Sequence, residues 1–262
     1  MEPTERIAKR LARAGIASRR GAEEMITAGR VRVNGSTITS PALNVSASDQ
    51  IVVDGKPLPA ADRSRVWRYH KPAGLVTTTA DEKGRATIFD RLPETLPRVM
   101  SIGRLDLNSE GLLLLTNDGG LKRRLELPAT GWVRRYRVRA KGAADAAALA
   151  PLQDGLTIDG ERFRPMQVVL DRQQGANVWL TVGLREGRNR EIRRAFEAVG
   201  LVVNRLIRIS YGPFQLGDLE SGGVEEVRAK ILRDQLGLPA AAPSRGAAEK
   251  PGPRVRRHRR DR

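Results

Sequence analysis

The 262-residue sequence predicts an α+β protein with a small helix-helix-strand module, a larger strand-rich domain flanked by helices, and a disordered basic tail. Three observations lead to this prediction. Two short helical patterns followed by short alternating runs fill residues 4–62. Residues 63–238, after a linker of proline and small polar residues at 57–64, contain repeated alternating or fully apolar runs typical of strands. Proline, alanine, glycine, serine and arginine prevail over residues 239–262, a composition typical of disorder.

The N-terminal module begins with two predicted helices. Residues 5–15 place apolar side chains at helical spacing, and Ser18 can cap a second helix that ends at Gly29. The runs at 31–35 and 51–55 then alternate and end in Asn-Gly or Asp-Gly, which predicts hairpins. These elements together predict a compact unit of two helices and a few short strands.

Positive charge is segregated on this module, because no acidic residue stands between positions 6 and 20. Such a face can follow a phosphate backbone, and an ordinary solvated helix surface is the alternative interpretation. The module residues that we expect to bind RNA are Arg6, Lys9, Arg10, Arg13, Arg19, Arg20 and Arg32.

The larger domain is expected to consist mainly of strands with short helices between them. In chain order we predict strand–turn–strand over 66–78, a short helix at 88–92, strands at 99–102 and 112–116, a turn at 117–120, a helix at 121–127, a strand at 132–140, a helix at 143–149, strands at 168–170 and 178–182, a helix over 192–199, a strand at 202–210 and a closing helix at 224–232.

One carboxylate stands between two of these strands. Asp106 follows Arg104 by two residues, and the strands at 99–102 and 112–116 hold its loop at both ends. A rigid mount of this kind suits a reacting group, and a lone carboxylate can act as nucleophile or general base. The alternative is a structural role, in which Asp106 caps backbone amides near Ser109. The residues alone leave both roles open.

The strand at 132–140 alternates between two faces. Tyr136 shares one face with apolar residues, whereas Arg135 and the next two alternate arginines point the other way and can contact phosphates. Tyr136 is either a core residue or a stacking platform for a base.

A second arginine cluster precedes the helix predicted over 192–199. Arg188, Arg190, Arg193 and Arg194 crowd its first turns, where cations oppose the helix dipole. A charge pattern that costs stability requires an anion, either a bound one or an internal carboxylate such as Glu186 or Glu191.

Composition narrows the class of partner and of chemistry. Lysine and arginine number 47 against 30 acidic residues, and this net charge of +17 favours a nucleic-acid partner over a merely soluble basic protein. The absence of cysteine excludes disulfides, thiol catalysis and zinc–thiolate sites, and two histidines do not supply a histidine-rich metal site. We expect no membrane span and a cytoplasmic location, because the sequence has no long apolar run and no apolar leader. These observations predict a basic RNA-binding protein but name no reaction.

The block around Asp106 carries a specific resemblance. Gly103-Arg-Leu-Asp-Leu-Asn-Ser-Glu-Gly-Leu-Leu-Leu-Leu-Thr-Asn-Asp-Gly119 resembles the bacterial ribosomal-RNA pseudouridine synthases of the RsuA/RluB type. Residues 15–20 and 29–35 resemble the ribosomal-protein-like (alpha-L type) RNA-binding module, and the whole resemblance covers about residues 4–235. Further blocks follow in the family's order, namely His70-Lys-Pro-Ala-Gly74, Arg135-Tyr-Arg-Val138 and Glu186-Gly-Arg-Asn-Arg-Glu-Ile-Arg-Arg194.

The resemblance implies a mixed, mostly antiparallel sheet and the isomerisation of a uridine to pseudouridine in ribosomal RNA, without metal or cofactor. The target uridine is flipped from its stack into a pocket. Asp106 starts the cleavage of the glycosidic bond, and Tyr136 stacks on or packs beside the uracil. Arg104 holds the opened site, and Arg193 pairs with Asp106. The residues of this domain expected to contact RNA are Lys71, Arg135, Arg188 and Arg190.

Within the family, residues 89–93, 188–200 and 205–212 are most similar to RluB, which modifies a uridine near the peptidyl-transferase centre of large-subunit RNA. Ser109-Glu110 is more like RluE, which lacks the N-terminal module. The expected partner is therefore large-subunit ribosomal RNA or a pre-ribosomal particle, bound by a monomer. The alternatives are a non-catalytic RNA-binding or ribosome-assembly protein, and a synthase that acts on small-subunit rRNA or tRNA.

Overall fold

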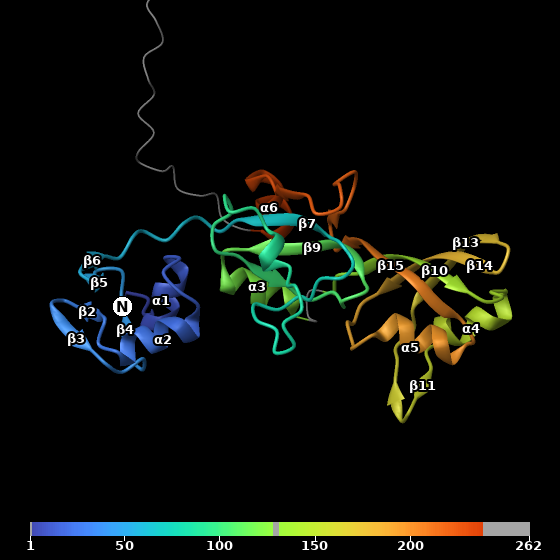
Figure 1. Cartoon of the computed structure of the whole chain (residues 1–262), viewed down its shortest axis with the longest axis horizontal. Helices are drawn as coiled ribbons and strands as arrows, with labels where there is room; N and C mark the ends of the chain where they lie inside the picture. Colours follow the sequence, from blue (N-terminus) through green and yellow to red (C-terminus); the bar gives the residue numbers. More distant parts are fainter. Residues whose placement is uncertain (1, 128–130, 238–262) are drawn as a thin grey trace, which may run out of the picture. The chain divides into compact units, whose positions relative to one another are not determined.

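The computed structural model describes residues 2–127 and 131–237, which form the α+β fold that the sequence predicts (Figure 1). The chain divides into two compact units, Met1–Val227 and Arg228–Arg262. The described part of the second unit is essentially one helix, α6 (Ala229–Leu236). The predicted tail at 239–262 lies outside the described residues, and a domain boundary near residue 62 stays a prediction.

The N-terminal module has its own small core. Its helices α1 (Ile7–Arg13) and α2 (Arg19–Thr27) bury Ile7, Leu11 and Ile26 against the small strands. Ser18 caps α2 as predicted, since its hydroxyl accepts a hydrogen bond from the Gly21 amide at 2.9 Å. The strands form a four-stranded sheet in the order β3-β2-β5-β6 and a pair β1-β4, with bounds β1 Glu5–Arg6, β2 Val31–Val33, β3 Ser36–Ile38, β4 Asn44–Val45, β5 Ile51–Val53 and β6 Lys56–Pro57.

A nine-stranded sheet dominates the rest of the first unit. Its strands follow the order β13-β14-β10-β15-β9-β7-β17, with β8 added beside β9 and β16 beside β15. The bounds are β7 Val66–Lys71, β8 Met100–Ile102, β9 Glu110–Thr116, β10 Arg134–Lys141, β13 Gln167–Gln174, β14 Asn177–Leu184, β15 Val202–Tyr211, β16 Phe214–Gln215 and β17 Val224–Glu226. The remaining elements are a 3-10 turn at Phe89–Arg91, α3 (Gly119–Glu126), α4 (Ala146–Asp154), α5 (Glu191–Ala198) and the pair β11 (Thr157–Ile158) and β12 (Glu161–Arg162).

Two antiparallel groups of strands meet where β15 runs parallel to β9. This parallel pairing joins Ile207 to Glu110 and Arg208 to Gly111. The backbones approach closely here, because a Cβ at Gly111 would lie only 2.4 Å from the Arg208 carbonyl oxygen, and Gly111 has φ +101. The loop at 103–109 enters β9 at this junction, so the junction places the loop between the two halves of the sheet.

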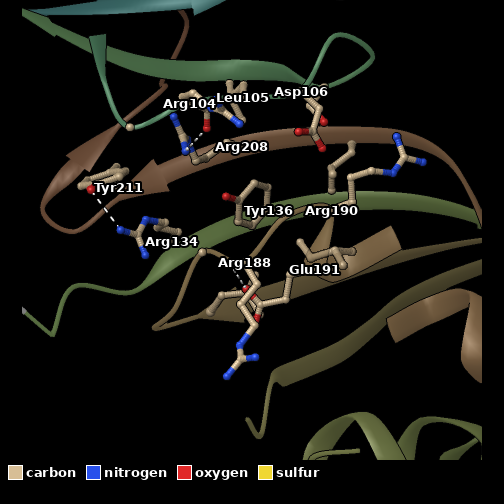
Figure 2. Close-up of a pocket in the computed structure, with 16 residues that line it drawn as sticks. Arg104, Leu105, Asp106, Arg134, Tyr136, Arg188, Arg190, Glu191, Arg208 and Tyr211 are labelled. Atoms are coloured by element: carbon tan, nitrogen blue, oxygen red, sulfur yellow. Dashed lines mark hydrogen bonds between the residues drawn. The ribbon is translucent and has the colours of Figure 1, made fainter. Parts of the chain in front are cut away.

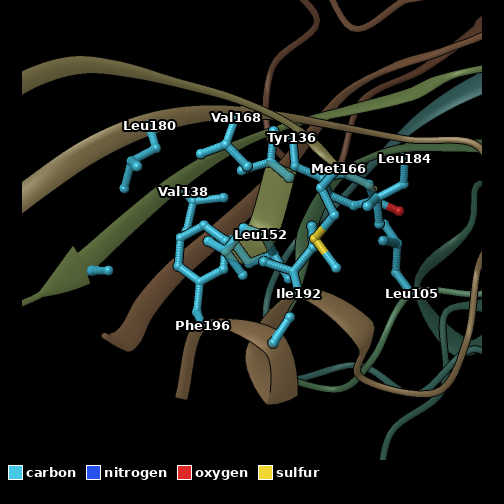
Figure 3. Packing of buried hydrophobic residues seen from close by; sticks show 14 of the residues in the cluster. Leu105, Tyr136, Val138, Leu152, Met166, Val168, Leu180, Leu184, Ile192 and Phe196 are labelled. Atoms are coloured by element: carbon cyan, nitrogen blue, oxygen red, sulfur yellow. The ribbon is translucent and has the colours of Figure 1, made fainter. Parts of the chain in front are cut away.

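One face of β10 supplies the core (Figure 3). Tyr136 and Val138 pack in one buried cluster with Leu152 of α4 and with Ile192 and Phe196 of α5. The predicted alternation of this strand is confirmed, because Tyr136 and Val138 are buried and the alternate arginines are exposed.

Three predicted elements take a different form. Residues 224–226 form β17, which pairs with β7, so the helix predicted at 224–232 begins only at Ala229. The predicted turn at 117–120 is the start of α3, since the Asp118 carboxylate accepts hydrogen bonds from the amides of Gly120 and Leu121. The second strand predicted within 66–78 is reduced to one bridge between Val76 and Thr87.

Candidate active site

The Asp106 loop, defined as residues 103–109, is fixed through its backbone. Side chains and amides from other segments donate hydrogen bonds to nearly every carbonyl of the loop. The donors are Arg208 Nη1 to Arg104 O at 3.5 Å, Thr77 Oγ1 to Leu105 O at 2.8 Å, the Gly74 amide to Leu107 O at 2.8 Å, Arg193 Nη2 to Asn108 O at 3.0 Å and Lys71 Nζ to Ser109 O at 2.8 Å. The loop is therefore the rigid mount that the sequence predicts.

The Asp106 carboxylate itself is left unpartnered. The hydrogen bonds and ion pairs of the described residues include none to this half-buried side chain. The Ser109 amide donates to the backbone carbonyl of Asp106 at 3.0 Å and not to the carboxylate. The structural alternative, in which Asp106 caps nearby amides, is therefore wrong, and the carboxylate is available to a ligand.

Asp106 and Tyr136 line one pocket at the junction of the two halves of the sheet (Figure 2). Tyr136 is only 9% exposed and belongs to the core cluster, yet its ring also forms a wall of the pocket. The two interpretations of Tyr136, core residue and platform beside a base, are thus both compatible with its position. The polar and charged side chains around the pocket include Arg104, Asp106, Arg134, Tyr136, Arg188, Arg190, Glu191, Arg208 and Tyr211.

Arg208 was not identified from the sequence, although its guanidinium supports the loop. It is 2% exposed and donates from Nε to Leu112 O at 2.7 Å, and its guanidinium lies 5.3 Å from the Tyr211 ring centroid. Its Nη2 is buried without a hydrogen-bond partner. The available signal was a charged residue between the apolar Ile207 and Ile209 of β15. Arg104, by contrast, has an exposed side chain at the pocket and lends only its carbonyl to Arg208.

Arg193 reaches the loop by a different route from the one that the resemblance implies. The expected ion pair with Asp106 is not formed, because the Arg193 guanidinium donates to the carbonyls of Asn108 and Val203 at 3.0 and 2.9 Å. Burial lowers the pKa of Arg193, Arg190 lowers it further, and the attraction of Asp106 opposes both. Arg193 therefore acts on the loop backbone, with Asp106 as an electrostatic neighbour.

The prediction that Lys71 contacts RNA is corrected. Lys71 is fully buried, and its ammonium donates to the carbonyls of Pro72, Leu107 and Ser109 at 2.9, 3.4 and 2.8 Å. Burial lowers its pKa to about 8, against the raising effect of the carboxylates of Asp106 and Glu110. A lysine in this position cannot reach a phosphate, and it anchors the Asp106 loop instead.

Two arginines at the start of α5 form ion pairs with Glu161, a carboxylate that the sequence analysis did not identify. Glu161 of β12 accepts from both Arg188 and Arg194 at 2.6 Å, and Arg188 also lies 3.2 Å from Glu186. Arg190, which has a left-handed backbone with φ 49, has no ion pair among the described residues and lines the pocket. The predicted unfavourable cluster is thus partly neutralised, and Arg190 retains its free charge.

Glu191 is a buried carboxyl at the same pocket. It is 3% exposed, its Oε2 accepts from the Arg188 amide at 2.9 Å, and its Oε1 has no partner. Burial and the neighbouring negative charge of Glu186 raise its pKa to about 7, against the lowering effect of the hydrogen bond from the Arg188 amide.

The basic residues of the N-terminal module differ in how much free charge they present. Lys9, Arg10 and Arg13 all lie within 3.0–3.7 Å of Glu5, and Arg19 lies 3.6 Å from Glu23. Arg6 donates to the carbonyl of Ala42. Arg20 and Arg32 have exposed side chains and form no ion pair with a described residue. Arg135 is exposed on the face of β10 opposite to Tyr136 and thus lies away from the pocket.

Within residues 2–127 and 131–237, no cluster of His, Cys, Asp and Glu has the size and arrangement to hold a metal ion. No helix in that part of the chain is long and apolar enough to cross a bilayer.

Comparisons with known proteins agree with this geometry. A model of the RNA pseudouridylate synthase family matches residues 65–198, and a model of the S4 domain matches residues 5–51. The chain is 49% identical over 231 residues to an uncharacterized RNA pseudouridine synthase of Rickettsia prowazekii, which covers 88% of this chain and 97% of the relative. It is 42% identical over 246 residues to ribosomal large subunit pseudouridine synthase B of Haemophilus influenzae, which covers 90% of this chain and 69% of the relative.

The fold is shared as well. A crystal structure of a pseudouridylate synthase matches with a TM-score of 0.63 at 25% identity, over 88% of this chain and 99% of that one. The matched family region contains Asp106, Tyr136 and Arg193, and the S4 match lies on the basic N-terminal module. The chain therefore belongs to the RNA pseudouridylate synthases, a family of isomerases, and to the RsuA/RluB type that carries an S4 RNA-binding domain.

Proposed function

We propose that this enzyme converts a uridine of large-subunit ribosomal RNA, near the peptidyl-transferase centre, into pseudouridine, and that Asp106 starts the reaction. The observation that carries the proposal is the free Asp106 carboxylate, which a loop held by hydrogen bonds to most of its carbonyls presents to the pocket beside Tyr136. Relatives named ribosomal large subunit pseudouridine synthase B, at 40–42% identity, support the choice of RNA.

The chemistry is an isomerisation that needs no external reactant. The target uridine leaves its stack and enters the pocket, where the Tyr136 ring lies against the base. Asp106 acts as base or nucleophile while the bond from N1 to the ribose C1′ breaks. The uracil turns, a bond forms between C5 and C1′, the hydrogen on C5 leaves as a proton, and N1 gains a proton. Arg104, exposed at the pocket, holds the opened RNA site, and Arg193 keeps the loop in place.

The basic surface holds the rest of the RNA. The exposed arginines of the N-terminal module that form no ion pair with a described residue, such as Arg20 and Arg32, bind phosphates, and Arg188 and Arg190 approach the RNA around the pocket. We place the boundary between this module and the catalytic domain near residue 62. The enzyme works as a monomer in the cytoplasm, where its RNA substrate is assembled.

The test is a map of pseudouridines in RNA from cells with and without this gene, read by carbodiimide modification and reverse transcription. We expect one stop to disappear from large-subunit RNA in the deletion and to return with the wild-type gene. A stop lost from small-subunit RNA or tRNA instead would contradict the choice of substrate. No lost stop in any RNA would contradict the proposed function and favour a non-catalytic RNA-binding protein.

A further inference from the structure

Along β10, one face of the sheet packs against helices α4 and α5, and the other face carries exposed side chains. Side chains alternate along β10, so Tyr136 and Val138 point into the core and the arginines between and beside them point the opposite way. We define the arginine face by its exposed cations and one aromatic residue, namely Arg135, Arg137, Arg139 and Lys141 of β10, Arg172 of β13 and Trp179 of β14.

The strands that carry this face contain few carboxylates. Strands β10, β14 and β15, which are neighbours in the sheet, contain no Asp or Glu. The ion pairs of the described residues include none of the five cations. The one acidic residue of β13, Asp171, accepts hydrogen bonds from the Thr181 hydroxyl at 3.0 and 3.1 Å. Arg205, opposite Arg139 in the register, shows the contrast, because it is paired with Glu110 at 2.7 Å.

Trp179 gives the same face an aromatic surface. Its half-buried ring has the Arg137 guanidinium at 5.1 Å and the Arg172 guanidinium at 5.9 Å from its centroid. These cation–π contacts hold two arginines beside the Trp179 ring without removing their charge. Free cations beside an aromatic ring are the combination that binds phosphates and stacked bases in a single strand.

We propose that the arginine face binds a second segment of the RNA substrate, apart from the segment that carries the flipped uridine. The inference rests on the proposed function. It follows from the alternation of β10, because Tyr136 lines the pocket and its neighbours Arg135 and Arg137 point from the other side of the sheet. A short RNA held at the pocket cannot touch both faces at this strand.

RNA is the occupant that the charges favour. Arginines two residues apart on a strand are about 7 Å apart, so β10 presents a regular row of positive groups. A regular row with no acidic residues interspersed suits a repeating phosphate backbone. The enzyme therefore needs a long, structured RNA, and a stem-loop cut out around the target uses only part of its binding surface.

The test compares two RNAs and two double variants of the full chain. The RNAs are a domain-length transcript of large-subunit rRNA and a short stem-loop cut from it around the modified uridine. The first variant is Arg137→Gln/Arg139→Gln. The matched control is Arg30→Gln/Arg63→Gln, which removes the same charge from exposed arginines that are already paired with Asp54 and Glu226. Dissociation constants are measured over a salt series, and pseudouridine formation is measured at saturating RNA.

We expect Arg137→Gln/Arg139→Gln to weaken binding of the long transcript about 3- to 10-fold and to reduce its salt slope by roughly 0.7–0.9 per lost phosphate contact. Binding of the stem-loop and the rate at saturation stay at the wild-type values, and the control variant matches wild type on both RNAs. With 4-thiouridine in the long transcript, crosslinks fall on the β10 and β14 peptides.

Two results would overturn the inference. Unchanged binding of the long transcript means that the arginine face serves another partner, such as an acidic protein. An equal loss on both RNAs means that no separate segment is bound. Neither result touches the proposed function, which fails only if the wild-type protein forms no pseudouridine in either RNA.

Discussion

At the scale of single residues, the site consists of one unpartnered carboxylate and the groups that fix its loop. The cations near Asp106, namely Lys71, Arg193 and Arg208, donate hydrogen bonds to backbone carbonyls and not to the Asp106 carboxylate. The Asp106 side chain is thus held in position without being consumed by an ion pair. Pre-organisation of this kind means that little reorganisation is required when the substrate arrives.

The raised pKa of Glu191 predicts that the free energy of unfolding falls as the pH rises. Its pKa of about 7 lies above that of a free glutamate because of burial. Between the unfolded pKa and pH 7 the folded protein holds a proton that the unfolded chain has lost, so the free energy of unfolding falls as the pH rises through this window. We expect Glu191→Gln to stabilise the protein at pH 8 by on the order of 1–3 kcal/mol, and to have little effect at pH 5.

Urea unfolding of both proteins at pH 5 and pH 8 checks this expectation. Exposed Glu197, on the same helix, provides the control, because Glu197→Gln should shift stability equally at both values. A Glu191→Gln protein that is less stable than wild type at pH 8 would show that an ionised Glu191 supports the fold.

Lys71 predicts an alkaline limit of activity. Burial lowers its pKa to about 8, so above this pH the folded enzyme loses the charge that holds three carbonyls around the loop. We expect kcat of the wild-type enzyme to fall above about pH 8. Lys71→Met should lower kcat at pH 7 by about tenfold, equivalent to about 1.4 kcal/mol of barrier, and should remove the further fall between pH 7 and 9. Single-turnover rates at saturating RNA measure this. If kcat of the variant fell between pH 7 and 9 as it does in the wild-type enzyme, another group would be responsible for the loss of activity at alkaline pH.

Part of the arrangement of the candidate site could be predicted from the sequence, and the roles of its residues stay predictions. The structure brings Asp106, Arg104 and Tyr136 to one pocket, as the motif implies. It buries Lys71, which the sequence placed against RNA, and it adds Arg208. Both differences arise from contacts between strands far apart in the chain, and local patterns contain no information about them.

At the scale of elements, the parallel contact between β9 and β15 is the feature that positions the site. It joins two antiparallel halves, and it brings Arg208 against the start of β9, from which the Asp106 loop emerges. Gly111 makes this contact possible, since any side chain at this position would meet the backbone of β15.

Gly111→Ala tests the importance of this contact. The added Cβ would lie 2.4 Å from the Arg208 carbonyl oxygen, and φ +101 is itself strained for alanine. We expect a loss of at least about 2 kcal/mol in unfolding free energy and a lower kcat. Gly55→Ala is the matched control, because Gly55 also has positive φ but its Cβ would meet nothing within 4 Å. Equal effects of the two substitutions on stability and kcat would contradict a special role for the β9–β15 contact.

Sequence periodicity predicted many elements and failed where distant pairing decides the outcome. The alternation of β10 and the Ser18 cap are local features, and both were confirmed. Residues 224–226 carry no strong local signal, and their pairing with β7, strengthened by Arg68 on Glu225, makes them a strand. The turn chemistry at 117–120 was recognised, but its Asp118 serves as a helix cap.

At the scale of the whole molecule, the formal net charge differs from the charge that is free to bind RNA, because internal carboxylates pair with part of the arginines. The net charge of +17 predicted a polyanionic partner, and the S4 match is consistent with RNA. Carboxylates such as Glu5 and Glu161 already occupy several of the arginines that the sequence singled out. The sequence could not show this, because those carboxylates become neighbours of the arginines only through folding.

The N-terminal module should therefore bind RNA through its unpaired arginines. We expect Arg20→Gln/Arg32→Gln to raise KM for rRNA about 3- to 10-fold and to leave kcat unchanged, since each lost phosphate contact weakens binding and does not alter the pocket. Lys9→Gln/Arg10→Gln is the comparison, with a smaller effect because Glu5 partly neutralises both cations. Steady-state kinetics over a salt series measure this, and a larger effect of the second pair would contradict it.

The central claim is that the unpartnered Asp106 carboxylate carries out the isomerisation. The most direct measurement is pseudouridine formation in large-subunit rRNA by purified wild-type protein and by Asp106→Asn, which keeps the shape and removes the charge. We predict formation by the wild-type protein, a loss on the order of 10²–10⁴-fold in the variant, and equal RNA affinity for both proteins. Full activity of Asp106→Asn would contradict the claim.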